Sequence, residues 1–378
     1  VPILFAPDFR VSPFGLWVIV AVVVSIAVGS LLSYSMNDPV VGISQPCENI
    51  LESFQTPLSL TVLILSLGSF LGAILLYLFG ISRFNLTTSL LNILILPGEF
   101  SIDRYQGFSA FPAHIKLLEY LIFPASLMGG LGLLSSKTKL NTFLLMSPIF
   151  ISLIYGSLLT TRSTILLSVI IWISGYLGGR VVSHDQIQKL FKPKFLIIST
   201  LSLVGFTILF LGTQILRQQG STVIIEELLE KLKAYFFGYL PAFTTWVDHY
   251  PNEHLAFGTI TFAGPFDLLG IVQRKPGFYQ DIAILGTSHT NVYTALRGLI
   301  SDFSIPGVLG LGVIIGLIET VAFRKCLKGS IYWLIPLTMF YAFTLYSPLI
   351  SIFNYNSVLM TWVIILGIFL VVPKLSSK

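Results

Sequence analysis

Three arginines in this chain of 378 residues have side chains suited to binding a phosphate group. Arg162, Arg217 and Arg297 each lie beside a long apolar stretch, where few other charges occur. A planar guanidinium donates paired hydrogen bonds to phosphate oxygens and stays charged in a partly dry site. One such arginine could simply extend its head group from apolar surface into water. Three of them predict a site for a multiply charged anion such as a pyrophosphate.

The densest run of polar side chains is residues 287–297, which ends at the third of these arginines. His289 has an ordinary pKa near neutrality, so it is a candidate general base toward a hydroxyl group. Asn291, Tyr293 and Thr294 offer amide and hydroxyl groups that suit a phosphate–sugar ligand. If a helix begins near residue 290, we expect Tyr293 or Thr294 to share a face with the arginine. Loop hydrogen bonding is the alternative role for Asn291 and Thr294, and an exposed loop position is the alternative for His289.

The elements that must position these residues are apolar helices. The chain is 54% hydrophobic and only 10% charged, whereas soluble domains carry about 25% charged residues. We therefore expect an all-α integral membrane protein with 9–10 or more membrane-spanning helices. Stretches of the length that a bilayer requires occur at residues 15–36, 58–80, 115–134, 140–159, 164–182, 195–212, 306–323, 331–349 and 357–372.

Basic residues predict the orientation of these helices. They collect in alternate connections, which the positive-inside rule assigns to the cytoplasm: Lys137 and Lys139; Arg180, Lys189, Lys192 and Lys194; Arg324, Lys325 and Lys328; Lys374 and Lys378. Residues 38–57 carry three acidic residues and neither Lys nor Arg, so we expect them outside. With Arg10 and Arg83 inside, inside and outside connections alternate correctly only if the short apolar stretch 86–96 also crosses the membrane.

The chain then divides into three consecutive parts: membrane helices in residues 1–212, a large extracytoplasmic segment in residues 213–304, and membrane helices in residues 305–378. The long segment contains a predicted amphipathic helix with an apolar face of Ile225, Leu228, Leu229, Leu232 and Phe236. Such a helix either lies flat at the membrane surface or packs in a small outer domain.

Metal and nucleic-acid chemistry are not expected. The two cysteines, Cys47 and Cys326, fall on opposite sides of the predicted membrane and should not pair. His249 and His254 lie in a proline-containing loop, where they do not share a helix face. No basic stretch is interleaved with aromatic residues as a nucleic-acid groove requires. We therefore predict no metal, no cofactor and no nucleic-acid partner.

The segment from Thr290 to Gly307, TNVYTALRGLISDFSIPG, resembles part of the Wzy-type polymerases of O-antigen and exopolysaccharide repeat units. That family shows a T-N-V-Y-T stretch, an arginine, and then D-F-G-x-x-G entering a membrane helix. Ser304 stands here in place of the usual glycine. The sequences around Arg162, around Arg217 and from Tyr239 to Phe243 resemble further family segments.

The resemblance implies a GT-C-like fold and a metal-independent glycosyltransferase in the bacterial inner membrane, with its active site facing the periplasm. The donor would be an oligosaccharide on undecaprenyl pyrophosphate, and membrane lipids, a chain-length regulator and a flippase would be partners. By this resemblance, the three arginines contact the donor pyrophosphate. Residues around the ligand would be Asn291, Tyr293, Thr294, Tyr239 and Asp302.

Two other functions remain open. An O-antigen ligase, which transfers the glycan to lipid A core, also has a large outer loop with a His-Asn motif. Here Thr290 separates His289 from Asn291, and the residues that follow match the polymerases better. A flippase or other transporter would carry charged residues near the membrane midplane. Glu119 and Glu319 are the few acidic residues near helix interiors, and both fall toward helix ends.

Overall fold

The structure is a computed structural model of the chain. It describes residues 9–36, 48–87, 89, 92–106, 111–183, 205, 207–208, 211–212, 225–250, 254–273, 279, 281–286 and 288–376. The chain forms two compact units. Unit 1 comprises Val1–Gln45 and Leu229–Leu359, and unit 2 comprises Pro46–Leu228 and Met360–Lys378. This division by contacts differs from the three consecutive parts predicted from the sequence, because the first helix packs on helices from late in the chain.

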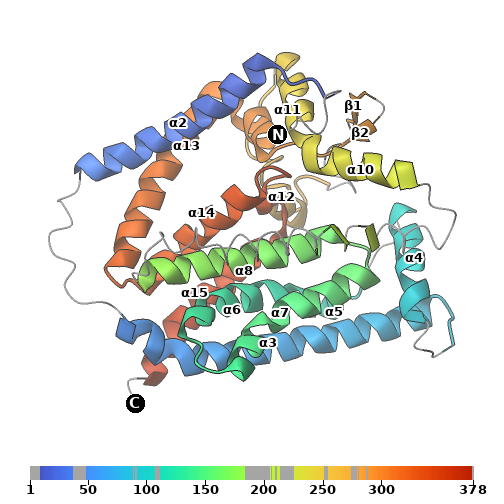
Figure 1. The fold of residues 1–378 in the computed structure, drawn as a ribbon, viewed down its shortest axis with the longest axis vertical. Helices are drawn as coiled ribbons and strands as arrows, with labels where there is room; N and C mark the ends of the chain where they lie inside the picture. The colour runs from blue at the N-terminus through green and yellow to red at the C-terminus, as the bar shows by residue number, and fades with distance from the viewer. Residues whose placement is uncertain are drawn as a thin grey trace. The chain divides into compact units, whose positions relative to one another are not determined.

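Both units are mostly helical (Figure 1). Unit 2 contains α3 (Glu48–Arg83), α4 (Asn92–Tyr105), α5 (Ala113–Tyr120), α6 (Ile122–Gly132), η1 (Leu133–Ser135), α7 (Lys139–Leu158) and α8 (Arg162–Val182). Unit 1 contains α2 (Pro13–Met36), α11 (Tyr239–Asp248), α12 (Ala263–Leu268), β1 (Ala283–Leu285), β2 (Ser288–Thr290), α13 (Ala295–Leu327), η3 (Ile331–Trp333), α14 (Leu334–Tyr346) and η4 (Ile352–Asn354). Two helices, α10 (Ile225–Phe237) and α15 (Asn356–Ser376), cross the boundary between the units along the chain.

Six helices of the described chain are long and apolar enough to cross a membrane, which agrees with an all-α membrane protein. They are Pro13–Ser35, Leu58–Arg83, Ala113–Ser135, Lys139–Leu158, Arg162–Val182 and Ala295–Leu327. The predicted spans near residues 331–349 and 357–372 correspond to shorter apolar helices, Ile331–Tyr346 and Asn356–Val371. Most of the predicted span 195–212 lies outside the described residues. The stretch 86–96 leads into α4, whose 14 residues extend only about 21 Å.

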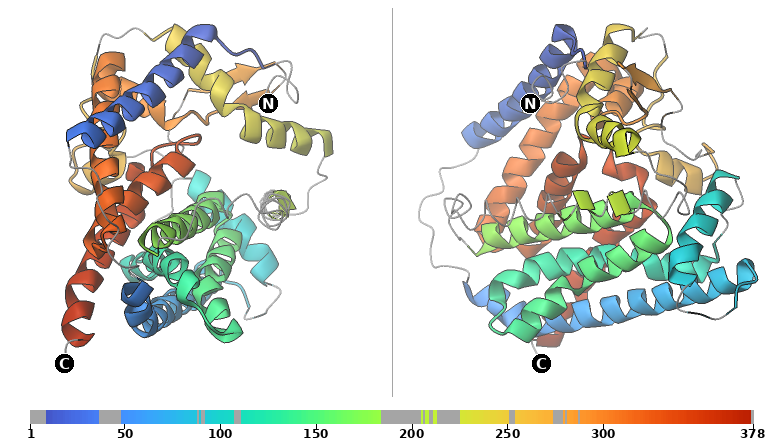
Figure 2. Two further views of the ribbon diagram at one scale, coloured as in Figure 1. Left: turned by 60° about the vertical axis from the view of Figure 1, so that its left-hand side comes forward. Right: turned by 45° about the vertical axis from the view of Figure 1, so that its right-hand side comes forward.

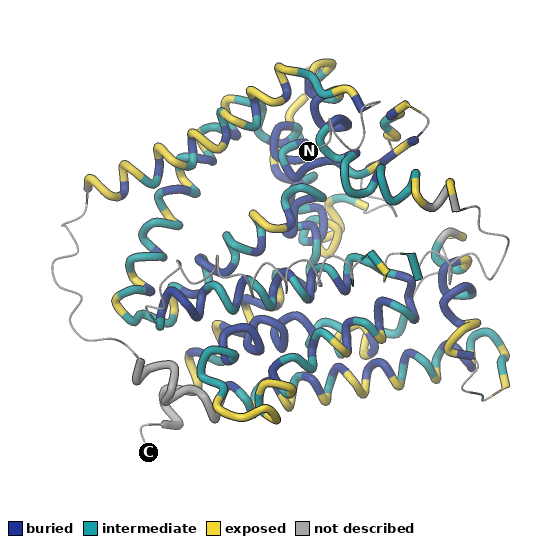
Figure 3. Tube along the Cα trace, in the orientation of Figure 1, coloured by how far each residue is buried: buried dark blue, intermediate teal, exposed yellow. Residues whose placement is uncertain are grey.

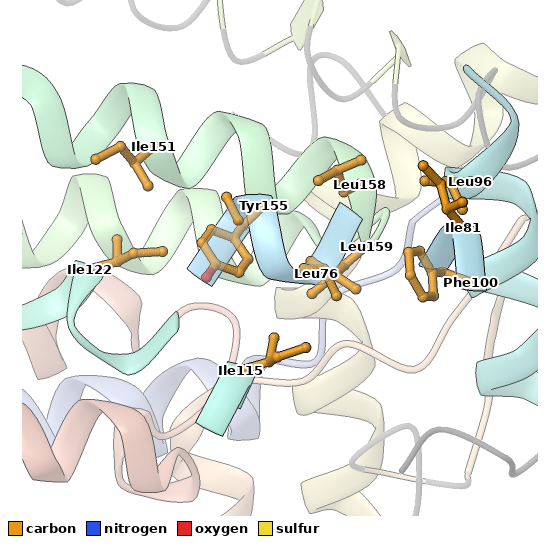
Figure 4. Packing of buried hydrophobic residues seen from close by; sticks show 11 residues of the cluster. Leu76, Ile81, Leu96, Phe100, Ile115, Ile122, Ile151, Tyr155, Leu158 and Leu159 are labelled. Atoms are coloured by element: carbon orange, nitrogen blue, oxygen red, sulfur yellow. The ribbon is translucent and has the colours of Figure 1, made fainter. Parts of the chain in front are cut away.

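Unit 2 is a bundle in which α6 is the central helix. All its residues are buried, and α3, α7 and α8 surround it (Figures 2 and 3). Glycines bring the backbones together: a Cβ on Gly130 would lie 2.0 Å from the Trp172 carbonyl oxygen. Small residues allow this close approach of membrane helices. Figure 4 shows Tyr155 among the buried residues of this unit, and its hydroxyl donates to the Ser69 carbonyl at 3.2 Å.

Contacts along the bundle show that α3 and α7 run parallel. Ser59 near the start of the apolar part of α3 donates to Asn141 at the start of α7, at 2.7 Å. Farther along both helices, Ser147 donates to Ser66 at 3.0 Å. The C-terminal end of α3 therefore lies at the end of unit 2 that also carries Arg162. We call the two ends of this unit the Lys137 end and the Arg162 end.

In unit 1, α2 and α13 also run parallel and pack through small residues. A Cβ on Gly312 would lie 2.0 Å from the Ser25 hydroxyl, and one on Gly316 would lie 2.0 Å from the Ile26 carbonyl oxygen. Small residues at these two positions let the helices pack this closely. Toward the far end of both helices, Arg324 lies 4.5 Å from the centroid of the Tyr34 ring. The end of α2 thus lies at the Arg324 end of unit 1.

These directions contradict the predicted alternation, which put the C-terminal end of α2 and the Arg324 end of α13 on opposite sides of the membrane. The C-terminal end of α2 lies with Arg324, and the N-terminal end of the apolar part of α3 lies with Lys137 and Lys139, both basic ends. With these directions, cytoplasmic and outer connections alternate along the chain even if residues 86–96 do not cross the membrane. Acidic residues contribute little to orientation, so the three in residues 38–57 are weak grounds for placing that segment outside. Arg83 pairs with Asp103 at 2.9 Å and has a local explanation.

The amphipathic helix forms as α10, but the face that packs differs from the predicted one. Ala234 is buried in a cluster with Phe9 and Leu285, and Phe237 packs against it. Lys233 of the same face lies 5.2 Å from the centroid of the Phe9 ring. Leu229, on the predicted apolar face, is 54% exposed. The side chains of Ile225 and Leu228 lie outside the described part of the chain.

The helix α13 is kinked where the sequence enters its long apolar part. Ser304 has φ 62° and ψ 171°, so two helical segments meet there. Pro306 then lies in the first turn of the second segment, where its missing N–H needs no partner. A φ and ψ of these values suit glycine far better than serine.

Candidate functional site

Arg162 is the first residue of α8, directly after a tight turn that ends α7. Thr160 closes the turn with φ 51°, and its N–H donates to the Ser157 carbonyl at 3.3 Å. The Thr161 N–H donates to the Gly156 carbonyl at 3.0 Å. These two bonds form the Schellman arrangement that ends many helices. The turn is therefore well defined, and it fixes where the Arg162 backbone lies.

A cation at this position opposes the helix dipole. The N-terminus of a helix carries about half a positive charge, so an acidic residue would be the stabilising choice by about 0.3–1 kcal/mol. Arg162 adds its charge to the first-turn N–H groups, which have no partner within the helix. Such an arrangement would suit an anion, and the predicted role of Arg162 in binding one remains a prediction.

Arg104 reaches the same turn and was not among the residues predicted from the sequence. Its guanidinium donates to the carbonyl oxygen of Leu159, the residue that caps α7. Glu119 lies at this end too, accepting a long 3.5 Å hydrogen bond from Thr164. The predicted crossing at residues 86–96 already put Arg104 outside, but no local pattern linked it to Arg162. The parallel α3 and α7 bring it to the Arg162 end.

Arg297 lies in unit 1, on the first turn of α13, and is enclosed by three aromatic rings. Its guanidinium carbon is 4.0 Å from the centroid of the Tyr293 ring, 4.1 Å from that of Tyr279 and 5.2 Å from that of Trp246. Guanidinium groups stack favourably on aromatic faces, more so when water is excluded. We call these three residues the aromatic box. It fixes the plane of the guanidinium.

Asp281 is the ion-pair partner of Arg297. The Arg297 Nη2 donates to the Asp281 carboxylate at 2.5 Å, and the carboxylate side chain is 73% exposed while that of Arg297 is 7% exposed. The second terminal nitrogen, Nη1, is buried and has no hydrogen-bond partner among the described residues. A buried charged donor without a partner is costly. The guanidinium thus retains one donor edge that an additional acceptor would satisfy.

The phenols of the aromatic box remain neutral. Burial raises the pKa of Tyr279 above its ordinary value, although the charge of Arg297 opposes part of that shift. Burial also raises the pKa of Tyr293, again against the effect of Arg297. Neither residue adds negative charge that would neutralise the guanidinium. Among these side chains, the carboxylate of Asp281 is the anionic partner.

Asp302 is fully buried and has both carboxylate oxygens occupied. It accepts hydrogen bonds from the backbone N–H of Ile260 at 3.1 Å and of Thr261 at 2.6 Å. The segment that it holds packs beside Arg297, since a Cβ on Gly298 would lie 3.5 Å from the Thr261 hydroxyl oxygen. This geometry suits a role for Asp302 in positioning that segment, and its predicted contact with a ligand remains a prediction.

The predicted polar run leading to Arg297 is a hairpin and a short connection. Strands β1 and β2 pair antiparallel with Ile284 opposite His289, and α13 starts only at Ala295. The conditional expectation of a helix from residue 290 is therefore wrong. The physical reason is that Ser288 and Thr290 turn inward on the hairpin, where Ser288 donates to Glu230 at 2.5 Å.

The remaining predicted residues of unit 1 have varied surroundings. His289 and Asn291 are exposed, whereas Thr294 is buried. The Thr294 hydroxyl has no hydrogen-bond partner within the described part of the chain. Tyr239 is the first residue of α11 and is partly buried. These side chains are placed on the elements around Arg297, but the exposed His289 lacks the enclosure that holds the arginine.

Arg162 and Arg297 belong to different units, and each unit is described by itself. Arg217 lies outside the described residues. The predicted convergence of three arginines therefore remains a prediction. Sequence reasoning missed Trp246, Tyr279 and Asp281, because they stand 16–51 positions before Arg297 and no local pattern links them to it.

A comparison with models of protein families finds no match for this chain. Comparisons with curated proteins and with solved structures find none either.

Proposed function

We propose that this chain is a metal-independent glycosyltransferase of the bacterial inner membrane. It joins oligosaccharide repeat units that are carried on undecaprenyl pyrophosphate. The reaction and substrate class rest on the resemblance of residues 290–307 to Wzy-type polymerases. What supports them physically is the membrane-spanning character of the helices and the two arginine environments.

The observation that carries the proposal is the guanidinium of Arg297. It is buried, oriented by the aromatic box, and paired through Nη2 with an exposed carboxylate, while its Nη1 has no hydrogen-bond partner among the residues described. Arg324 Nη1 lacks a partner there as well, so the exposed carboxylate partner is the feature that distinguishes Arg297. One free edge and one exchangeable partner suit a group that binds an incoming anion.

In the proposed reaction, an acceptor sugar hydroxyl attacks the anomeric carbon of the donor glycan. The bond to lipid pyrophosphate breaks, and negative charge develops on the leaving group. Arg297 stabilises this charge, and Arg162 with the adjoining N–H groups of α8 supplies a second positive site. Arg217 is the third candidate. Fixed donors aimed at a developing charge stabilise the transition state more than the ground state.

Other residues take supporting roles in this proposal. His289 is the candidate base that accepts the proton of the attacking hydroxyl, and its exposure leaves it open to a substrate. Asn291, Thr294 and Tyr239 are candidate contacts for the sugar. Tyr293 orients Arg297 through its ring. A chain-length regulator and a flippase are partners that only the resemblance implies.

The proposal places the site on the extracytoplasmic face. The basic residues Lys137 and Lys139 mark the opposite end of unit 2 from Arg162. Arg324 and Lys325 mark the opposite end of α13 from Arg297. The positive-inside rule then assigns both arginines to the outer side.

The test is polymerisation by the purified protein in EDTA, with a lipid-pyrophosphate-linked repeat unit as the only substrate. The proposal predicts a ladder of longer lipid-linked glycans. Transfer only after lipid A core is added would identify a ligase. No transfer of cognate substrate to either acceptor would refute glycosyl transfer and favour a transporter.

A further inference from the structure

An exposed apolar tip projects from the segment 254–273 of unit 1. It consists of Phe257, Leu268, Leu269 and Ile271, whose exposed fractions are 74%, 78%, 72% and 60%. Single exposed apolar residues are common on protein surfaces, but four large ones within fifteen positions are unusual. The segment is too short and too irregular to span a bilayer. These side chains therefore need another explanation than a membrane crossing.

The local backbone gathers three of the four side chains at one turn. The helix α12 ends in a Schellman arrangement, with the Gly270 N–H donating to the Asp267 carbonyl at 3.0 Å and the Ile271 N–H to the Phe266 carbonyl at 2.9 Å. Gly270 has φ 72°, a conformation that glycine adopts at little cost. The reversal holds Leu268, Leu269 and Ile271 on the outside of the turn.

The segment is fastened to the beginning of the apolar part of α13. The Ala256 N–H donates to the Ser301 carbonyl at 3.0 Å, and the Phe257 N–H to the Asp302 carbonyl at 3.2 Å. Both acceptors lie within a few residues of the kink at Ser304, after which the helix is continuously apolar. The tip therefore lies near the level at which this helix enters the hydrocarbon region.

A second attachment joins the segment to the start of α15. It independently places the tip near the level at which an apolar helix begins. The Asn354 side-chain oxygen accepts from the Ala263 N–H at 3.2 Å. The Asn356 side chain donates to the Gly264 carbonyl at 3.0 Å, and Asn356 is the first residue of α15. The segment is thus tied to the ends of two apolar helices, both of which begin at the Arg297 end of unit 1.

We propose that this tip inserts into the headgroup–acyl boundary of the membrane leaflet at the Arg297 end. Lipid is the occupant that fits, because the two attachments hold the tip at the boundary of helices that must themselves be surrounded by lipid. Insertion removes this apolar surface from water, which is favourable. Insertion is shallow, as expected of a short interfacial element. It fastens the segment that Asp302 holds beside Arg297.

The test is lipid quenching of a fluorophore attached at Leu269. Leu269→Cys is made with both native cysteines replaced by serine, labelled with an environment-sensitive dye, and reconstituted into vesicles. The vesicles carry a spin label at an acyl carbon either near the headgroup or deep in the leaflet. Val24→Cys in the middle of α2, where Val24 is 53% exposed, is the matched deep reference in the same background.

We expect the dye at Leu269 to be quenched at least twofold more by the shallow than by the deep spin label, and Val24→Cys to show the reverse order. Strong quenching by iodide in the buffer, without quenching by either lipid, would place the tip in water and overturn the proposal. Protection from iodide without lipid quenching would also overturn it, and would indicate a second copy or another protein as the occupant.

Discussion

At the scale of the residue, the pairing of Arg297 and Asp281 decides how an anion would enter the site. The carboxylate is mostly exposed and the guanidinium is buried, so the two partners differ in how easily they move. The exposed Asp281 side chain has room to move into water once another acceptor pairs with the guanidinium, whereas the aromatic box holds Arg297 in place. In the proposed function, a substrate phosphate would displace this carboxylate.

Removing this competitor should strengthen substrate binding. In Asp281→Asn the negative charge is lost while the size of the side chain is kept. We expect KM for the lipid-linked donor to fall several-fold in steady-state polymerisation assays. Asp267→Asn, which removes another exposed carboxylate of unit 1, is the control and should leave KM unchanged. A KM that rises in Asp281→Asn would show instead that the carboxylate supports binding.

Asp302 should act through stability and local order. Asp302→Asn keeps one acceptor oxygen but presents an amide NH₂ to the second backbone N–H. We expect it to lower the free energy of unfolding by about 1–3 kcal/mol, seen as a lower thermal midpoint in detergent. Asn291→Ala, at an exposed position, is the comparison and should have little effect on that midpoint. An unchanged midpoint in Asp302→Asn would argue against the positioning role.

At the scale of the element, the kink in α13 links the site to the membrane. Ser304 adopts a backbone conformation that costs a residue with a side chain about 1–3 kcal/mol. The Ser304 hydroxyl offsets part of this conformational cost by accepting a 3.5 Å hydrogen bond from the Gly307 N–H. The kink lets one chain segment carry both Arg297 and a long apolar helix.

Two substitutions separate strain from capping. Ser304→Gly relieves the strain and loses the cap, whereas Ser304→Ala loses the cap and keeps the strain. Loss of a serine cap costs about 0.5–2 kcal/mol, less when glycine replaces it. We expect Ser304→Gly to match or exceed the thermal midpoint of the unchanged protein, and Ser304→Ala to fall below it. The opposite order of the two variants would rule out the strained kink.

At the scale of the whole molecule, the helix directions predict a membrane topology that can be measured. The chain between α2 and α3 contains Cys47, and both flanking helix ends lie at basic ends of their units. In sealed cells or right-side-out vesicles, we expect Cys47 to resist a membrane-impermeant maleimide until the membrane is opened. Glu99→Cys, on α4, made with Cys47 and Cys326 replaced by serine, should react at once because that helix lies at the Arg162 end. Reaction of Cys47 in sealed cells would restore the outside location first predicted.

The sequence predicted the apolar helices well, because length and hydropathy are properties of local composition. It placed Arg162 beside the start of an apolar helix, and the structure makes it the first residue of that helix. It could not predict which helices run parallel, since that depends on contacts between distant residues such as Ser25 and Gly312. The aromatic box was missed for the same reason.

The central claim is that Arg162 and Arg297 bind the donor pyrophosphate and stabilise its departure. The most direct measurement is the initial polymerisation rate of Arg162→Ala and Arg297→Ala in EDTA, beside Arg324→Ala at the opposite end of α13 as the control. Loss of one fixed donor to a developing charge typically costs about 10²- to 10³-fold in rate. We expect losses of that size in the first two variants and near-normal activity in the third. Full activity in either Arg162→Ala or Arg297→Ala, with the fold intact, would contradict the claim.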